Sequence, residues 1–385
     1  MPTVWRWNTA LINSVNSNDG QQVMDINSIA RPEIVAMKPY VSARSSAAAD
    51  GILLNANEAP YPLVDGSQWQ RLALNRYPSP QPAQLKARLA GLYGVAESNL
   101  LVTRGSDEGI DLLTRVFCRP DRDAIVECSP CFGMYRIAAT IQAAQVIDVP
   151  RLARSGFRID FANLERVIAE QAGVRLVFLT SPNNPTGDLI GRTELKRVLK
   201  ACEGKALLVL DEAYIEFCSA ESASSLLGQY PQLVVLRTLS KAWAAAGVRC
   251  GTVIADAAVI SLLQRVIAPY PLAATAIDAA LQAISGDAIS RHQQLLEMVR
   301  EGKRDLLEFL TKCDWVRELW EGEANFVLLR IADAGEMVNW CAGCGIRIRD
   351  FSAQPQLEGC VRLTIGSADE MAVLKACLQA YGERT

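Results

Sequence analysis

The stretch VRLVFLTSPNNPTG, residues 174–187, joins an almost wholly apolar run to a turn rich in asparagine and proline. Apolar residues on both faces are typical of a strand that helices cover on each side, as in a parallel sheet. The turn would then lie at the carboxyl end of that strand, which is where α/β sheets bind their ligands. This stretch therefore predicts an α/β fold and a candidate binding turn.

The same pattern repeats along the chain from about residue 100. Short apolar runs occur at 100–105, 124–130, 145–150, 205–214, 233–240 and 248–256, and amphipathic runs lie near 107–118, 133–143, 161–171 and 192–202. This alternation predicts a large, mainly parallel sheet. After APYPLAAT, residues 268–275, a long helical run precedes shorter strand-like runs, which predicts a smaller α+β domain over 276–385.

Composition and charge exclude several classes of protein. The chain has 385 residues and a net charge of −3, so no general electrostatic attraction draws it to nucleic acid or acidic membranes. No apolar run approaches the ~20 residues that span a bilayer. The first 28 residues lack the features of a signal peptide. We therefore expect a cytoplasmic protein with neither a nucleic-acid nor a membrane partner.

Histidine and cysteine usage narrows the chemistry. His292 is the only histidine, and it lies in a polar run, SRHQQ, that predicts a solvated helix residue. A Ser-His-Asp triad or a multi-histidine metal site would depend on it alone. The 11 cysteines include two Cys-x-x-Cys pairs, Cys128/Cys131 and Cys341/Cys344, which lie far apart. Because zinc-ribbon spacing is missing, we expect reduced, mostly buried thiols and no metal site.

Two segments offer groups for an anionic ligand. In RGSDEGIDLL, residues 104–113, Gly105, Ser106 and Asp107 end a strand and begin a helix. Backbone N–H groups there can form an anion-binding cup, although Ser106 or Asp107 could serve only to cap the helix. In SPNNPTG, Asn184 could donate a hydrogen bond to a ligand, unless the segment is only a turn.

Two further segments add a carboxylate and an amine. In LLVLDEAYIEF, residues 207–217, Asp211 follows four apolar residues and Tyr214 comes three positions later. A partly desolvated carboxylate there needs a cation or a strong donor, unless it caps a helix. In RTLSKAWAAAGVRCG, residues 237–251, Lys241 and Arg249 flank an alanine-rich stretch interrupted by Trp243. Arginine binds phosphate, and a desolvated lysine becomes a nucleophile.

The four segments together supply the groups that pyridoxal 5′-phosphate needs. These are an anion cup for its phosphate, a carboxylate for its pyridine nitrogen, polar groups for its phenolic oxygen and an amine for its aldehyde. In that order, the candidates are residues 105–107 with Ser240 and Arg249, then Asp211, then Asn184 with Tyr214, and finally Lys241. The sequence therefore predicts a site for this cofactor.

From about residue 29 to its end, the chain resembles the fold-type I pyridoxal-phosphate enzymes, and closely the histidinol-phosphate aminotransferase family. The resemblance rests on LNANEAP, NRYPSPQP, RGSDEGIDLL, CFGMY, SPNNPTG, DEAYIEFC, RTLSKAWAAAGVRCG, APYPL, GIRIRD and CVRLTIGS. It implies a large cofactor-binding domain at 61–275 and a small α+β domain at 276–385. Residues 29–60 would form a segment that packs with the small domain, after an N-terminal extension at 1–28.

The resemblance also implies roles within the cofactor site. Lys241 would bond to the cofactor and carry the proton between the reacting carbons, while Asp211 would keep the pyridine nitrogen protonated. Phe132 stands where the family usually stacks a tyrosine, which keeps the π-face and loses a hydroxyl. Tyr77 would reach the cofactor phosphate of a neighbouring subunit in a homodimer. The catalytic residues implied are Lys241, Asp211 and Tyr214, and the cofactor-binding residues are Ser106, Asp107, Phe132, Asn184, Asp211, Tyr214, Thr238, Ser240, Lys241, Arg249 and Tyr77.

Substrate binding is implied for residues of both domains. Arg349 and Arg362 match arginines that hold the substrate's anionic ends, and two arginines suit a substrate with a phosphate arm. Asn57, Asn184 and Tyr61 complete the set; some relatives carry a tyrosine at the position of Ala59, close to Tyr61.

The implied reaction transfers an amino group from glutamate to imidazole acetol phosphate and gives L-histidinol phosphate and 2-oxoglutarate. An aminotransferase for aromatic substrates, or a decarboxylase of an amino-acid phosphate, would use the same Lys241 and Asp211, so both alternatives stay open. A non-catalytic cofactor-binding protein is disfavoured, because all the catalytic positions are filled.

Overall fold

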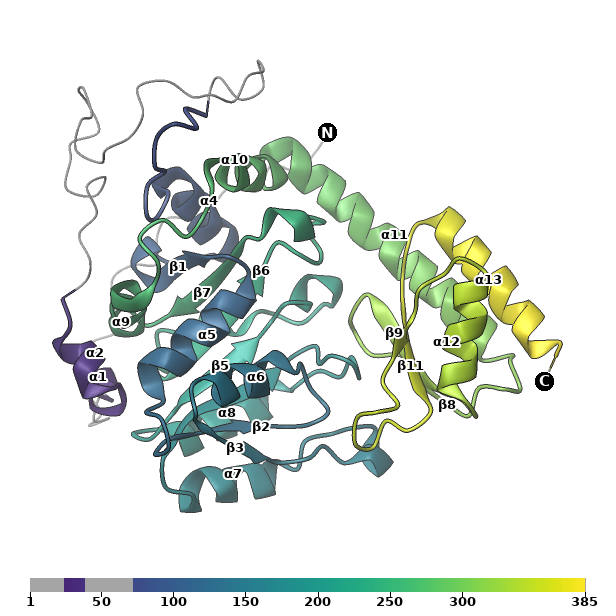
Figure 1. Cartoon of the computed structure of the whole chain (residues 1–385), viewed down its shortest axis with the longest axis horizontal. Helices are drawn as coiled ribbons and strands as arrows, with labels where there is room; N and C mark the ends of the chain where they lie inside the picture. The colour runs from purple at the N-terminus through teal and green to yellow at the C-terminus, as the bar shows by residue number, and fades with distance from the viewer. Residues whose placement is uncertain (1–23, 39–71, 385) are drawn as a thin grey trace.

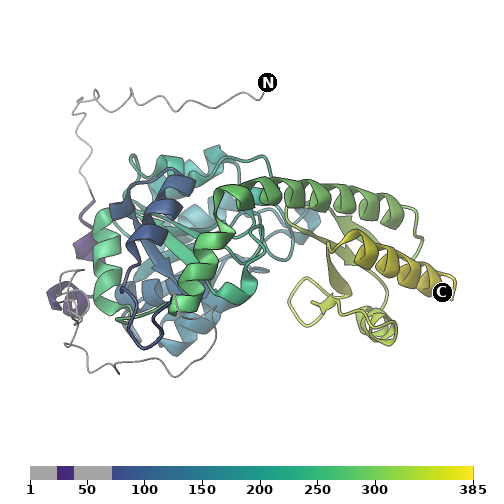
Figure 2. The same cartoon turned by 90° about the horizontal axis from the view of Figure 1, so that it is seen from above.

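Two β-sheets in two lobes form the structure, a computed structural model that describes residues 24–38 and 72–384. The larger lobe holds a seven-stranded sheet, and the smaller lobe holds a four-stranded sheet near the C-terminus (Figure 1). A single long helix, α11 (Gly286–Leu310), runs from one lobe to the other, as the view from above also shows (Figure 2).

The large sheet is mainly parallel, as the sequence predicted. Its order is β1 (Leu100–Thr103), β7 (Gly251–Ala255), β6 (Leu233–Thr238), β5 (Leu207–Asp211), β4 (Val174–Thr180), β2 (Ala124–Glu127) and β3 (Gln145–Asp148). Only β7 is antiparallel to its neighbours, β1 and β6. The other strands therefore bring their carboxyl ends to one edge of the sheet.

Helices cover both faces of this sheet because its strands are apolar on both sides. In β4, Leu176 and Phe178 pack with α5 (Ser106–Phe117), α6 (Met134–Ile141) and α9 (Ala257–Val266). Val177 and Leu179 pack on the opposite face with α4 (Ala83–Tyr93), α7 (Phe161–Glu170), α8 (Arg192–Cys202) and α10 (Ala274–Ala283). Burying each such side chain contributes about 1.5–3 kcal/mol to folding stability. The predicted α/β fold is therefore confirmed, and burial of both faces of the sheet is its physical cause.

The described N-terminal piece belongs to the large lobe. It forms the short helices α1 (Ile26–Ile29) and α2 (Pro32–Ala36), whose apolar residues join the core beside α5 and α9. The Arg265 guanidinium donates to the Ile34 carbonyl over 3.0 Å. Of the segment predicted at 29–60, residues 29–38 thus contact the large lobe, and residues 39–60 lie outside the described residues.

The small lobe is an antiparallel sheet packed against three helices. Its strand order is β10 (Arg349–Asp350), β11 (Cys360–Thr364), β9 (Phe326–Arg330) and β8 (Glu318–Trp320), and its helices are α11, α12 (Ala334–Gly343) and α13 (Ala368–Gly382). Tyr214 and Ala242, which follow β5 and β6 of the large sheet, lie in the same apolar core. The two lobes therefore meet at the carboxyl ends of the large-sheet strands.

Candidate active site

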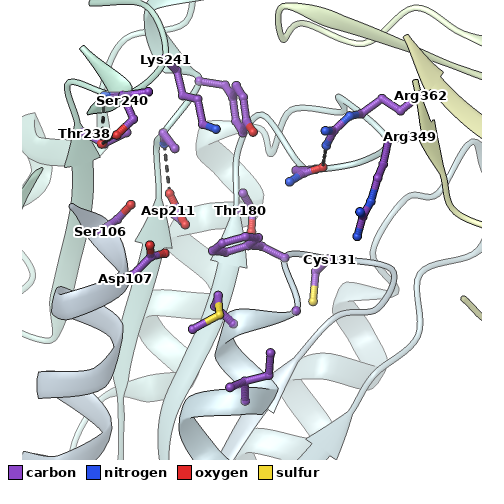
Figure 3. A pocket seen from close by; sticks show the side chains of 18 of the residues that line it. Ser106, Asp107, Cys131, Thr180, Asp211, Thr238, Ser240, Lys241, Arg349 and Arg362 are labelled. Carbon is purple, nitrogen blue, oxygen red and sulfur yellow. Dashed lines mark hydrogen bonds between the residues drawn. The ribbon is translucent and has the colours of Figure 1, made fainter. Parts of the chain in front are cut away.

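A cavity of about 570 Å³ opens where the two lobes meet, at the carboxyl edge of the large sheet (Figure 3). It gathers residues from segments far apart in the sequence. The predicted site residues that line it are Ser106, Asp107, Phe132, Asn184, Asp211, Tyr214, Thr238, Ser240, Lys241, Arg249, Arg349 and Arg362.

One end of the cavity is a cradle of hydrogen-bond donors. Helix α5 begins at Ser106, and its N-cap is Gly105, so neither Ser106 nor Asp107 caps the helix. Arg249 donates to Ser240 Oγ over 3.2 Å and approaches Asp107 Oδ2 at 3.3 Å, and Ser240 also contacts the Thr238 hydroxyl at 2.9 Å. Hydroxyls and a guanidinium thus surround uncapped backbone N–H groups, a set that suits phosphate.

Gly105 is required for this cradle. Its φ of +78° is unfavourable for other residues, and a Cβ there would lie 2.6 Å from Arg249 Nη2. The strand end therefore leaves room for the guanidinium only because residue 105 has no side chain.

Asp211 lies at the end of β5 and is almost fully buried, with 3% of its surface exposed. Its Oδ2 accepts a hydrogen bond from Tyr135 Oη at 2.8 Å, and its Oδ1 accepts one from the Ala213 N–H at 3.0 Å. Tyr135 Oη also bonds the Thr180 hydroxyl at 2.8 Å. Desolvation outweighs these hydrogen bonds and raises the pKa of Asp211 to about 6, so a cationic ligand atom would stabilise its charged form.

Lys241 projects into the cavity from the turn that follows β6 (Figure 3). Its side chain is exposed to the cavity, and the turn is closed by the Ala245 N–H, which donates to the Leu239 carbonyl at 3.0 Å. Desolvation, followed by repulsion from Arg362, lowers the pKa of Lys241. A lowered pKa favours the neutral amine, which is the form that attacks a carbonyl.

Tyr214 lies beneath Lys241, with the lysine Nζ 5.6 Å from the centre of its ring. The ring is held edge-on against Phe326 at 5.4 Å. Burial raises the pKa of Tyr214 to about 12, so its hydroxyl keeps its proton and can act as a hydrogen-bond donor.

The opposite wall carries two arginines from the small sheet. Arg349 and Arg362 are directly opposite each other on the antiparallel strands β10 and β11, a placement that is unfavourable for two like charges. Arg362 donates to Asn184 Oδ1 at 2.5 Å, and its Nε is buried without a hydrogen-bond partner among the described residues. Desolvation and then Arg349 lower the pKa of Arg362. This wall therefore suits an anionic ligand.

Several residues of the site were not predicted from the sequence. Tyr135, which is fully buried and contacts Asp211 without lining the cavity, lies in CFGMY, and its spacing of three from Phe132 was the only signal for it in the sequence. The unpredicted residues that line the cavity are Cys131, Gly133, Met134, Ile137, Thr180, Ala213, Ala246, Phe351 and Gln354. Burial raises the pKa of the Cys131 thiol well above its ordinary value, so this thiol is neutral.

Three predicted residues are not placed at the cavity. Tyr77 stacks on Tyr270 with ring centres 4.3 Å apart and is 47% exposed, and its contact with a neighbouring subunit stays a prediction. Asn57 and Tyr61 lie outside the described residues.

The prediction that His292 is solvated is wrong. It lies on α11, as expected for a helix residue, but its ring is half-buried and stacks on Trp243 at 3.9 Å. The polar residues around His292 in the sequence do not indicate this burial, because the residue that covers its ring, Trp243, belongs to the large lobe.

The described residues carry neither a group of three or more His, Cys, Asp or Glu side chains that could hold a metal ion nor a helix long and apolar enough to cross a membrane. The donor set instead fits pyridoxal 5′-phosphate: a phosphate cradle, a buried carboxylate that needs a positive partner, an amine and the aromatic Phe132 share one cavity. The fold and the site thus define a fold-type I enzyme that uses this cofactor.

The chain belongs to the class I and II aminotransferases: the family described as "Aminotransferase class I and II" matches residues 50–378. It is 42% identical over 348 residues to the histidinol-phosphate aminotransferase of Cronobacter sakazakii, covering 90% of this chain and 94% of that protein. The fold is similar to that of the histidinol-phosphate aminotransferase of Clostridium acetobutylicum, with a TM-score of 0.74, 22% identity and coverage of 81% and 92%. The Sinorhizobium meliloti enzyme of the same name, in complex with pyridoxal-5′-phosphate, has a TM-score of 0.73, 22% identity and coverage of 81% and 84%.

Proposed function

We propose that this enzyme is a histidinol-phosphate aminotransferase that transfers the amino group of glutamate to imidazole acetol phosphate, giving L-histidinol phosphate and 2-oxoglutarate. The observation that carries the substrate assignment is the Arg349/Arg362 pair, which faces Lys241 across the cavity (Figure 3). Two guanidinium groups suit the two charges of a phosphate arm, and the glutamate side-chain carboxylate can use the same place in the other half-reaction. The names of relatives about 40% identical over most of the chain support the same assignment.

The residues of the large lobe would hold the cofactor. Ser106, Ser240 and Arg249 bind its phosphate, with Asp107 and Thr238 keeping the arginine and the serine in place. Bound pyridoxal phosphate supplies an electron sink for the negative charge that develops at the substrate Cα.

Polar groups around the ring of the cofactor set its charge. Asp211 would hold the proton on the pyridine nitrogen, since its own carboxylate is buried and benefits from a positive partner. Tyr214, protonated at neutral pH, and the amide of Asn184 would donate to the phenolic oxygen. Phe132 would offer the ring an aromatic face without a hydroxyl.

Lys241 performs the acid–base step. Its amine, which has a lowered pKa, would take the proton from the substrate Cα and act as the proton carrier of the site. Arg362, held by Asn184 and stacked over Phe326 and Phe351 at 5.0 and 5.3 Å, orients the anionic end of the substrate.

Assembly and location are part of the same proposal. The functional unit is a homodimer in which Tyr77, 47% exposed in the single chain, contacts the phosphate site of the partner. The enzyme acts in the cytoplasm on small soluble substrates, with no nucleic-acid or membrane partner.

A spectroscopic titration tests the function. L-Histidinol phosphate is expected to bleach the visible absorbance of the bound cofactor, 2-oxoglutarate to restore it, and Lys241→Ala to abolish both changes. Bleaching by aromatic amino acids but not by L-histidinol phosphate would mean an aromatic aminotransferase. Release of carbon dioxide from an amino-acid phosphate without any requirement for an oxo acid would mean a decarboxylase.

A further inference from the structure

The turn that carries Lys241 is attached to the long inter-lobe helix by a pair of stacked rings. Trp243, two residues after Lys241, lies parallel to His292 of α11, with ring centres 3.9 Å apart and planes 5° apart. Trp243 is 8% exposed, and His292 is the only histidine of the chain. Neither ring lines the cavity described above.

The far edge of the indole is fixed by a buried ion pair. Trp243 Nε1 donates to Glu216 Oε1 at 3.2 Å, and Arg237 donates to the same oxygen at 2.8 Å. Glu216 lies in η3 (Ile215–Phe217), just after Tyr214. Trp243 is thus held by the large lobe at its edge and by α11 across its face.

The turn needs such support because its backbone is unfavourable. Ala244, directly after Trp243, has a φ of +51°, and Arg249 of the phosphate cradle has a φ of +55°. Residues other than glycine keep left-handed conformations only where their surroundings impose them. The two rings therefore restrain the backbone on the carboxyl side of Lys241.

His292 contributes to the contact through its ring face. Its Nε2 is buried and has no hydrogen-bond partner among the described residues. Burial lowers the pKa of His292 although Glu216 opposes this effect, so the stacked ring is neutral at neutral pH. A neutral aromatic ring of similar size should therefore replace it.

We propose that His292 is a positioning residue: by stacking on Trp243 it fixes the Lys241 turn against α11 and so sets where the lysine amine stands in the active site. The assignment rests on the proposed function only in taking Lys241 as the reacting amine. It gives a role to the single histidine and to the tryptophan that interrupts the alanine-rich stretch.

The test compares His292→Ala, which removes the stack, with His292→Phe, which keeps it, and Gln293→Ala, an exposed neighbour on α11, as control. In the holoenzyme, His292→Ala is expected to lower kcat by about tenfold to a hundredfold, as displacement by ~1 Å does, with little change in KM. It should also shift the pH at which the absorbance of the bound cofactor changes. His292→Phe and Gln293→Ala should behave like the wild type in both measurements.

A third readout does not depend on turnover. Since the chain has one histidine, histidine-selective isotope labelling gives one imidazole signal, which should show the ring-current shift of the stack and lose it in Trp243→Leu. If His292→Ala kept the absorbance titration and the kcat of the wild type, the proposal would be overturned. Equal losses of kcat in His292→Ala and His292→Phe would overturn it as well. The absorbance titration requires only the cofactor, so it reports on His292 even if L-histidinol phosphate is not the substrate.

Discussion

The cavity has one wall from each lobe, and each wall holds charge in an unfavourable setting: negative charge on the large-lobe wall and positive charge on the small-lobe wall. On the large-lobe wall, a carboxylate, Asp211, is buried with hydrogen-bond donors, and no side chain in the described part of the chain forms an ion pair with it. On the small-lobe wall, two guanidinium groups, Arg349 and Arg362, face each other across neighbouring strands. A positive ligand atom would stabilise Asp211 and negative ones would stabilise the arginine pair; in the proposed function these are atoms of the cofactor and of the substrate.

The walls also differ in how they are held. Asp211 sits in the centre of a seven-stranded sheet, fixed by Tyr135 and a backbone N–H. Arg362 depends on one hydrogen bond to Asn184 in the other lobe and on stacking with two phenylalanines. A rigid wall suits a group that stays bound, whereas a wall bridging two lobes suits ligands that exchange.

The largest expected effect is the loss of turnover in Asp211→Asn. An amide cannot hold the charged pyridine nitrogen, so kcat should fall by about 10²–10³-fold, as on removal of one preorganised electrostatic group.

Tyr135→Phe should have a smaller effect at the same carboxylate. It removes a hydrogen-bond donor and raises the pKa of Asp211 further, so it should move the acid limb of kcat/KM to higher pH. Steady-state rates across pH measure both, and an unchanged limb in Tyr135→Phe would contradict the role of that hydrogen bond.

The same Asp211→Asn change should stabilise the cofactor-free protein. Burial raises the pKa of Asp211 from 3.8 to about 6, so its contribution to folding is fully present below about pH 4 and is lost as the pH rises through about 6. The asparagine variant has no such loss. Relative to their difference at pH 4, the variant should gain about 2 kcal/mol over the wild type at pH 7. Urea unfolding of both cofactor-free proteins at the two pH values measures this, and a constant difference would refute it.

On the substrate wall, Arg362→Ala should weaken substrate binding more than Arg349→Ala. Arg362 is partly buried and oriented by Asn184, whereas Arg349 is exposed. Loss of a charge-assisted hydrogen bond costs about 1.5–3 kcal/mol, so KM for L-histidinol phosphate should rise by about tenfold to a hundredfold in Arg362→Ala and by less in Arg349→Ala. Cofactor absorbance should be retained in both variants. Equal KM effects would show that burial does not distinguish the two arginines.

The last prediction concerns stability, at the contact between the two lobes. Gly187, which ends the Asn184 turn, has a φ of +75°, and a Cβ there would lie 2.7 Å from Gly322 Cα of the small lobe. Gly156, with a φ of +67° and open space around it, is a matched control. Gly156→Ala should cost about 1 kcal/mol of backbone strain, and Gly187→Ala about 1–3 kcal/mol more from overpacking. Equal losses of unfolding free energy would mean that the lobes adapt without cost.

Much of the large-lobe wall could be predicted from sequence. Asp211, Lys241 and Arg249 all follow or flank apolar runs, and a parallel sheet brings the carboxyl ends of such runs to one edge whatever their separation along the chain. Periodicity alone thus predicted the sheet, and residue chemistry at the strand ends predicted the kind of ligand.

Other features depended on packing between segments, which local patterns do not encode. Tyr135 bonds Asp211 across a helix and a strand, 76 positions apart, and Arg349 meets Arg362 only through the register of two short strands. His292 reads as a solvated residue from its neighbours, yet Trp243 covers its ring from the other lobe. The sequence by itself determined the strands, the reactive residues that follow them and the class of cofactor. Only the tertiary structure decided which side chains lose water and which charges face each other, because those depend on which segments, distant in the sequence, the fold packs together.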